Sequence, residues 1–267
     1  DLLVVGCGTL GQRVARLWPG KAIGVTRGAD RHADLTAMGI EPVLRDKLEG
    51  EFADVVFTAA PSGNSDYVGE VEYALERWNG TGGFVFTSSG GVFAEGDGAL
   101  VTETGDVLPR EGNPRAAALL DAEDKVRARG GAVVRLSGLY THTRGPHSFW
   151  LRAGKVKGRP DGLINMVHYD DAASLVVAVL GTFPGQGAGQ TFLGNDDAVL
   201  TREEIVAAAR QHPDYRDAPP VEFGPKEGPL GRRYDNSWTR NMTGWVPKYK
   251  SMSAFWAQEA ATDSTRV

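Results

Sequence analysis

The sequence predicts an α/β fold, a doubly wound parallel sheet followed by a small irregular C-terminal region. Three observations predict it. Residues 2–18 read as an apolar strand, a glycine-rich turn and an amphipathic helix. Apolar strands then alternate with helical segments as far as residue 136, which is typical of parallel sheets with helices on both faces. The last third is less periodic and richer in Pro and Gly.

The glycines of the first turn have G-x-G-x-x-G spacing, with Gly6, Gly8 and Gly11 around Thr9 and Leu10. Gly6 would permit the tight turn, Gly8 the close approach of a pyrophosphate, and Gly11 the packing of helix on strand. The helix N-terminus would offer free N–H groups to the phosphates. A glycine turn without a ligand is the alternative, but the position between strand and helix favours a bound dinucleotide and a Rossmann-type sheet.

The later elements follow in the same alternation. Strands are predicted over 21–26, 41–44, 53–59, 83–87 and 132–136, and helices over 65–78, 113–129, 169–181 and 202–211. We expect residues 1–139 and 164–193 to form the dinucleotide-binding domain. Residues 140–163 and 194–267 would then form a small substrate-binding and C-terminal region.

Composition narrows the function classes. The chain has 267 residues, 41% of them hydrophobic, and its net charge of −5 argues against a nucleic-acid surface. No apolar run approaches the length of a membrane span. The single cysteine, Cys7, excludes a disulfide framework and favours a reducing compartment, the cytoplasm or an organelle matrix or stroma. The five histidines show no ligand spacing, so the sequence predicts no metal site.

The end of the second strand bears on the choice of cofactor. NAD sites commonly carry a carboxylate here for the ribose hydroxyls, whereas this chain reads Thr26-Arg27. Arg27 could pair with a 2′-phosphate, so NADP is favoured over NAD, although Arg27 could also be a solvated loop residue. The other expected cofactor contacts follow the third and fourth strands: Asp46 near the adenine, and Ala59, Ala60 and Pro61 beside it.

Several later segments together resemble one family. They are FVFTSSGGVF (84–93), VVRLSGLY (133–140), INMVHYDDAA (164–173) and DNSWTRNMTGWVPKY (235–249). The chain resembles the short-chain dehydrogenase/reductase superfamily, in its extended, epimerase/dehydratase-like branch. The resemblance implies that Ser89 is catalytic and that Thr87 and Ser88 lie beside the cofactor.

One departure from the family governs the mechanism. The family carries a catalytic Tyr and, four residues later, a Lys that holds the nicotinamide ribose. Counting 26 positions from Ser89 reaches Arg115, four further on is Leu119, and Glu123 falls on the family's usual Glu. Leu119 cannot bind a ribose hydroxyl, and an arginine with a pKa above about 12 is a poor proton shuttle. The chain therefore resembles the atypical members of the superfamily.

Two residues are candidates to replace the missing acid. Tyr140 lies in the loop that the resemblance places over the nicotinamide end, although it could instead have a packing role. His168 lies in the H-x-D segment of the family, although it could instead be a structural residue that fixes the return of the chain to the sheet. We expect His142 and His147 to be exposed loop residues. These features predict an NADP-dependent oxidoreductase or epimerase with a divergent proton-transfer group and an unidentified small-molecule substrate. The alternative is a non-catalytic dinucleotide-binding regulator, assembly factor or complex subunit with partner proteins.

Overall fold

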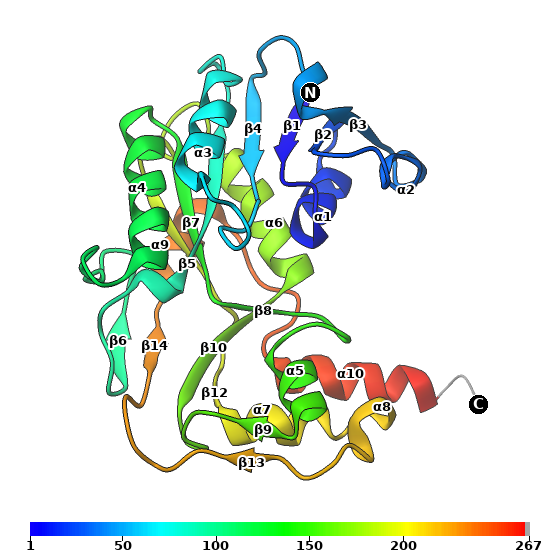
Figure 1. Cartoon of the computed structure of the whole chain (residues 1–267), viewed down its shortest axis with the longest axis vertical. Coiled ribbons are helices and arrows are strands. Elements are labelled where there is room, and N and C mark those ends of the chain that lie inside the picture. Colours follow the sequence, from blue (N-terminus) through cyan, green and yellow to red (C-terminus); the bar gives the residue numbers. More distant parts are fainter. Residues whose placement is uncertain (265–267) are drawn as a thin grey trace.

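Seven strands form the central sheet of the molecule (Figure 1). The computed structural model describes the backbone of residues 1–264 and the side chains of residues 1–259. The strands are β1 (Leu2–Val5), β2 (Ala22–Thr26), β3 (Ile40–Leu44), β4 (Asp54–Phe57), β5 (Phe84–Ser89), β7 (Ala132–Leu136) and β11 (Thr191–Gly194). Their order is β11-β7-β5-β4-β1-β2-β3, and every neighbouring pair is parallel. The strand order reverses between β1 and β4, so the predicted doubly wound parallel sheet is confirmed.

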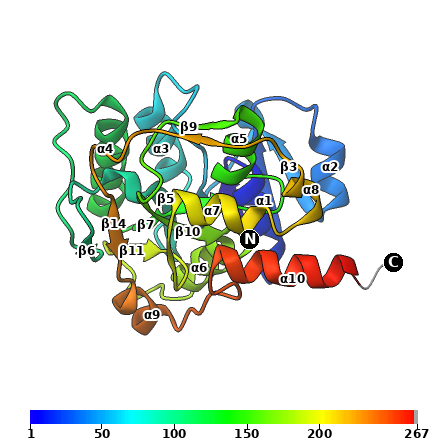
Figure 2. The same cartoon turned by 90° about the horizontal axis from the view of Figure 1, so that it is seen from below.

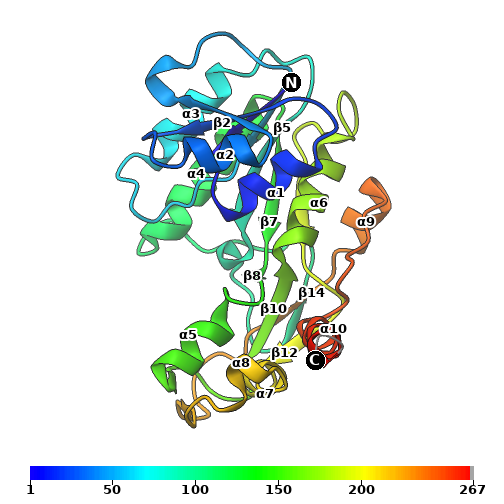
Figure 3. The ribbon, with the colours of Figure 1, turned by 90° about the vertical axis from the view of Figure 1, so that its right-hand side faces the viewer.

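Both faces of this sheet are apolar, because successive residues of a strand point to opposite sides. Leu2 and Val4 belong to one buried cluster, and Leu3 and Val5 belong to the other. Helices α1 (Thr9–Leu17), α2 (His32–Ala37) and α6 (Tyr169–Leu180) contribute to the first cluster. Helices α3 (Tyr67–Glu76) and α4 (Pro114–Ala128) contribute to the second, on the opposite side of the sheet (Figure 3).

The predicted boundaries differ most at β4 and β5. The strand expected over 53–59 ends at Phe57, so its last residues are free to form a loop. The strand expected to end at Thr87 continues through Ser89, because Ser88 and Ser89 pair with Arg135 and Leu136 of β7. This pairing fixes the backbone of Ser89, the predicted catalytic serine, at the carboxyl end of the central strand β5.

A smaller lobe lies beyond the carboxyl ends of the central strands. Its three-stranded sheet and its helices are β8 (Gly138–Tyr140), β10 (Leu163–His168), β12 (Val199–Thr201), α5 (Pro146–Ala153), α7 (Arg202–Ala209), α8 (Pro213–Arg216) and α10 (Met252–Ser264). Figure 2 shows α7 and α10 in front in the view from below, where the two helices are in contact. The lobe has its own core, with Tyr140, Met166, Ile205 and Trp256 all buried. The region expected to be irregular is therefore largely folded; its strands are too short for their periodicity to be read.

Three further features complete the fold. Strand β6 (Ala99–Val101) pairs with β14 (Arg232–Tyr234), which also contacts β10 of the smaller lobe. Strand β9 (Lys155–Val156) pairs with β13 (Glu222–Phe223) within the smaller lobe (Figure 1), and helix α9 (Ser237–Thr243) contacts β11 and α6. The chain crosses between the parts repeatedly: β10, expected in the dinucleotide-binding domain, pairs with β8 and β12 of the smaller lobe. Among the described residues, no helix combines the length and apolarity needed to cross a membrane.

Candidate functional site

A cavity of about 850 Å³, here called the main cavity, opens at the carboxyl ends of β1, β2, β4, β5 and β7. Ligands of doubly wound sheets bind at this edge, next to the point where the strand order reverses. Twelve of the residues expected at the site line it: Gly6, Gly8, Thr9, Leu10, Thr26, Arg27, Ala59, Ala60, Pro61, Thr87, Ser88 and Ser89. Gly11, Asp46, Tyr140 and His168 do not line it.

The three glycines of the first turn have different surroundings. Gly6 has φ +92°, and a Cβ there would lie 2.3 Å from the backbone nitrogen of Ala59. A Cβ on Gly11 would lie 2.7 Å from the carbonyl oxygen of Gly6 and from Oγ1 of Thr58. A Cβ on Gly8 would meet only the Gly6 carbonyl oxygen, at 4.0 Å. Gly6 and Gly11 are thus required by the protein itself, whereas at Gly8 the protein leaves room, which a ligand can occupy.

The N-terminus of α1 points its unpaired donors at this turn. Gly8 is the N-cap residue and no side chain caps the helix, and the first turn carries no acidic residue. The free N–H groups and the positive end of the helix dipole are therefore available to an anion. Cys7, in the same turn, is 8% exposed, and burial raises the pKa of its thiol to about 11, so the thiol remains protonated.

Charged side chains surround the cavity end beside β2. Arg27 and Arg31 are exposed and line the cavity, and neither side chain has an ion-pair or hydrogen-bond partner among the described residues. Arg45 also lines it but is paired with Glu70 at 3.3 Å. Asp30 also lines the cavity, and this carboxylate lies four residues beyond Thr26, outside the strand end where a carboxylate for the ribose is commonly found.

The structure corrects the expectation that Asp46 contacts the cofactor near its adenine. Asp46 lies in the short 3-10 segment Arg45–Lys47 and is exposed outside the cavity, and its neighbour Arg45 lines the wall instead. The single-turn helix decides which of the adjacent side chains faces inward, and such a turn has no periodic signal.

The two serines at the end of β5 differ in their contacts: the Ser88 hydroxyl is bonded to a buried carboxylate, whereas the Ser89 hydroxyl has a proton left to donate. The Ser88 hydroxyl donates to Oε1 of Glu123 at 2.6 Å. The same buried carboxylate accepts a hydrogen bond from the Arg135 guanidinium at its Oε2, at 2.8 Å. Burial alone would raise the pKa of Glu123, but the bonds and charge of Arg135, with Ser88 and Arg127, bring this pKa below its ordinary value. Ser89 Oγ accepts from the N–H of Gly91 at 3.1 Å, and its own proton has no acceptor among the described residues. The Ser89 hydroxyl can therefore donate into the cavity.

The two residues that the sequence count predicts at the positions of the family's Tyr and Lys lie in the cavity lining. Arg115 and Leu119, on α4, both line the cavity together with Ser89. Leu119 is buried, and Arg115 is exposed with no partner among the described residues. Arg144, from the loop after β8, lines the cavity as well, also with an unpaired side chain in the described part of the chain. Among the described residues, five arginines and two carboxylates line the cavity, in a chain whose net charge is −5.

The assignment of Tyr140 and His168 to the cavity is corrected. They face each other across the parallel pair of β8 and β10, with ring centroids 5.2 Å apart, and Phe255 packs on both. Tyr140 is fully buried, its hydroxyl has no partner, and burial raises its pKa far above the usual value. His168 accepts from the N–H of Asp170 at 3.2 Å, and burial lowers its pKa to about 4. Both side chains belong to the core of the smaller lobe, because their strands join that lobe's sheet.

Tyr169 is a further lining residue that the sequence did not predict, as are Asp30, Arg31, Arg45 and Arg144. It begins α6, its ring lies 5.6 Å from the guanidinium of Arg13, and it is the one tyrosine in the cavity lining. Tyr169 directly follows His168, where a strand ends and a helix begins. Side chains on either side of such a boundary point in different directions, so this boundary was the sequence feature that could have indicated Tyr169.

Solved structures share this architecture, and several of them contain NAD. A functionally unknown conserved protein from Silicibacter pomeroyi is 20% identical over 98% of both chains, with a TM-score of 0.77. A short-chain dehydrogenase/reductase superfamily protein from Agrobacterium tumefaciens with bound NAD is 18% identical, with a TM-score of 0.76 over 99% of this chain and 97% of that chain. A UDP-glucuronic acid 4-epimerase from Bacillus cereus in complex with NAD is 16% identical, with a TM-score of 0.76 over 99% of both chains.

No protein-family model matches the sequence, and no curated protein matches it. At identities of 20% or less, the similar structures establish the fold and leave the activity to the site itself. This chain has the fold of the short-chain dehydrogenase/reductase superfamily, in the form seen in its epimerase- and dehydratase-like members, as its sequence motifs predicted.

Proposed function

We propose that the chain binds NADP in the main cavity and acts as an NADP-dependent oxidoreductase or epimerase on an anionic small molecule. The observation that carries the proposal is the lining itself: the Gly8 turn, open toward the cavity, with unpaired arginines at both ends. When bound, the nicotinamide supplies hydride transfer, and the protein supplies binding and orientation.

The preference for NADP rests on Arg27 and Arg31. Their guanidinium groups are unpaired at the end of β2, where an NADP 2′-phosphate would lie, and a planar guanidinium matches phosphate geometry. Asp30 is the competing feature, because a carboxylate there could accept the ribose hydroxyls of NAD.

Titration calorimetry of both cofactors tests this preference. A charge-assisted phosphate contact is worth about 1.5–3 kcal/mol, so Arg27→Ala should weaken NADP about ten-fold to a hundred-fold and leave NAD unchanged. Arg129→Ala is the matched control, an exposed arginine that does not line the cavity. Equal losses for the two cofactors would show that Arg27 does not read the 2′-phosphate.

An anionic substrate follows from the other end of the cavity. Arg115 and Arg144 are unpaired there, and Ser89 has a hydroxyl proton to donate to a substrate carbonyl or hydroxyl oxygen. The Bacillus cereus neighbour acts on UDP-glucuronic acid, whose carboxylate and diphosphate are such anions. For this chain we assign Arg115 to binding the substrate anion, since an arginine retains its charge and does not relay protons at neutral pH.

Proton transfer needs another group, and we assign it to Tyr169. It is the one phenol in the lining, and the lining contains no histidine. Tyr169→Phe should lower kcat about 10²-fold to 10⁴-fold with NADP affinity unchanged, the range for removal of a general acid. Tyr140→Phe is the matched control, because that phenol lies outside the cavity.

The second candidate is a non-catalytic NADP-binding protein, and two observations favour it. Leu119 offers no ribose contact, and both predicted substitutes for the missing acid are packed into the smaller lobe. Following NADPH absorbance against carbonyl compounds, and the products formed from UDP-glucose and UDP-glucuronic acid, separates the two. Turnover lost in both Ser89→Ala and Tyr169→Phe supports the enzyme. Tight NADP binding without any turnover or hydride exchange supports the non-catalytic protein.

A further inference from the structure

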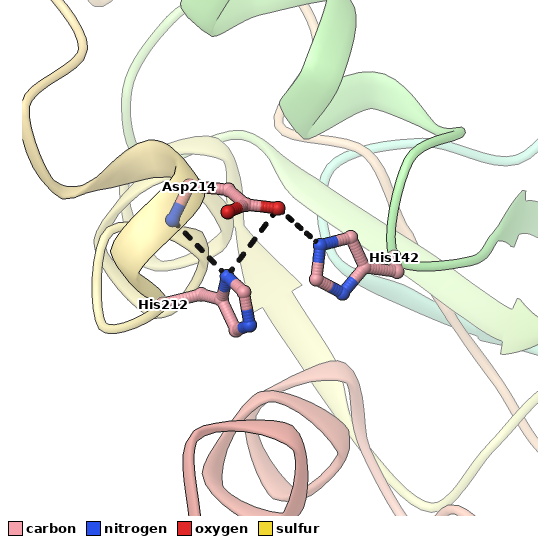
Figure 4. A group of neighbouring side chains, drawn as sticks. All are labelled: His142, His212 and Asp214. Atoms are coloured by element: carbon pink, nitrogen blue, oxygen red, sulfur yellow. Dashed lines mark hydrogen bonds and ion pairs between the residues drawn. The ribbon is translucent and has the colours of Figure 1, made fainter. Parts of the chain in front are cut away.

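Three side chains in the smaller lobe form a compact cluster outside the main cavity (Figure 4). His142 lies in the loop after β8, His212 is the N-cap residue of α8, and Asp214 lies in the first turn of that helix. One ligand atom from each side chain lies within 4.8 Å of the other two. Two imidazoles and a carboxylate are a recurrent ligand set for zinc.

The contacts of His142 indicate that a cation belongs in the cluster. Its Nδ1 lies 3.2 Å from Oε2 of Glu259 on α10, and its Nε2 lies 2.8 Å from Oδ2 of Asp214. Ionised carboxylates only accept hydrogen bonds, and a neutral imidazole has one donor nitrogen. When Nδ1 donates to Glu259, the Nε2 lone pair faces the lone pairs of Asp214. Two such acceptors 2.8 Å apart need a cation between them, which is either a second ring proton or a bound metal ion.

His212 turns an unprotonated nitrogen toward the same carboxylate. The backbone N–H of Asp214 points at His212 Nδ1, 3.2 Å away, and an N–H can only donate. The Nδ1 lone pair is therefore on the side of the cluster, 3.9 Å from Oδ2 of Asp214 (Figure 4). His212 is 2% exposed, so its ring is held in this orientation by packing.

The surroundings hold the His142 ring as well. Its carbonyl oxygen accepts from His147 Nε2 at 3.0 Å and from the Tyr215 hydroxyl at 2.9 Å. Its ring meets His212 edge to face, with centroids 4.3 Å apart. Glu259 on the far nitrogen repeats the carboxylate–histidine arrangement that orients metal-bound imidazoles and sets their tautomer. An exposed ion pair would not require these additional contacts to the His142 ring and backbone.

We propose that His142, His212 and Asp214 bind a divalent metal ion, Zn²⁺, with Glu259 as the outer partner of His142. The ligand atoms would be His142 Nε2, His212 Nδ1 and an Asp214 carboxylate oxygen. Zinc bonds of about 2.0–2.2 Å in a tetrahedron place ligand atoms about 3.4 Å apart. The two distances from Asp214 Oδ2, 2.8 Å to His142 and 3.9 Å to His212, lie on either side of that value.

Reaching these metal-ligand distances would mainly require the Asp214 side chain to move. The Asp214 side chain is 62% exposed and can move between the two rings, and His212 Nδ1 exchanges its N–H contact for the metal. Three protein ligands leave a fourth position for water or a small anion. The site would tie the loop after β8, which also carries Arg144 into the main cavity, to α8.

The test is Zn²⁺ titration of the full chain, prepared with a chelator and without an affinity tag. We expect one Zn²⁺ per chain, and Co²⁺ in its place should give the visible absorption of a tetrahedral site. Asp214→Asn should weaken Zn²⁺ binding by more than ten-fold, and Glu259→Gln about ten-fold to a hundred-fold, the range for an outer carboxylate. Asp217→Asn is the matched control, an exposed acid at the other end of the same helix.

The outcomes separate this site from the main cavity. NADP affinity should be the same in Asp214→Asn as in the unsubstituted chain, since Asp214 does not line that cavity. Zn²⁺ affinity that is equal in the unsubstituted chain, Asp214→Asn and Asp217→Asn would mean adventitious binding and would overturn the proposal. So would the absence of Zn²⁺ binding, because the shared cation would then be a proton on His142.

Discussion

Gly8→Val should abolish dinucleotide binding and leave the fold intact. A Cβ at position 8 would have a single neighbour, the Gly6 carbonyl oxygen at 4.0 Å, and Gly8 has an extended backbone at φ −88° that valine can adopt. The free energy of unfolding should therefore change by less than about 1 kcal/mol. The valine methyl groups would occupy the space in front of the α1 N-terminus, where the phosphates approach.

The expected loss of binding follows from the contacts blocked. Charge-assisted hydrogen bonds contribute about 1.5–3 kcal/mol each, so losing two from the helix N-terminus weakens NADP about 10²-fold to 10⁴-fold. Calorimetric titration measures the affinity and urea unfolding measures the stability. Gly96→Val is the matched control, because a Cβ at Gly96 is equally uncrowded and Gly96 does not line the cavity.

Two results would refute this account. If Gly8→Val binds NADP as tightly as the unsubstituted chain, no phosphate approaches that backbone. If Gly8→Val unfolds while Gly6→Ala does not, the roles of the two glycines have been exchanged. Gly6→Ala should be strongly destabilised, since its Cβ would lie 2.3 Å from the Ala59 nitrogen and φ +92° disfavours a side chain.

Three further predictions concern buried polar groups. Tyr140→Phe removes a hydroxyl without a partner, so the free energy of unfolding should stay the same or rise by about 1 kcal/mol in urea melts, and a clear loss would show an unseen partner. Glu123→Gln leaves Arg135 buried beside a neutral amide and should cost about 3–5 kcal/mol by the same measurement, whereas a loss below about 1 kcal/mol would mean that the pair is solvated. Burial raises the pKa of Asp196 from 3.8 to about 8. Between these two pH values the folded state retains a proton that the unfolded state releases. The free energy of unfolding therefore falls as pH rises from about 4 to 8. Asp196→Asn should therefore gain stability relative to the unsubstituted chain across that range, by a few kcal/mol near pH 8, and a pH-independent difference would contradict the shift.

The sequence alone determined the central sheet and the cofactor turn, because both are local. Strands with apolar side chains on both faces and the spacing of Gly6, Gly8 and Gly11 are readable within a few residues of chain. The fold class followed from these features and was confirmed. The count from Ser89 predicted that Arg115 and Leu119 lie near it, and all three residues line the cavity.

Tertiary structure decided everything that depends on which sheet a strand joins. Tyr140 and His168 lie at the ends of β8 and β10, which pair with each other in the smaller lobe, so their rings enter that lobe's core and leave the cavity to Tyr169. His142 and His212 are 70 positions apart and have no ligand spacing, yet the packing of α8 against the loop after β8 brings them together. Periodicity reports which face of an element is apolar, but contacts between distant segments depend on packing across the whole chain, and only the folded chain specifies them.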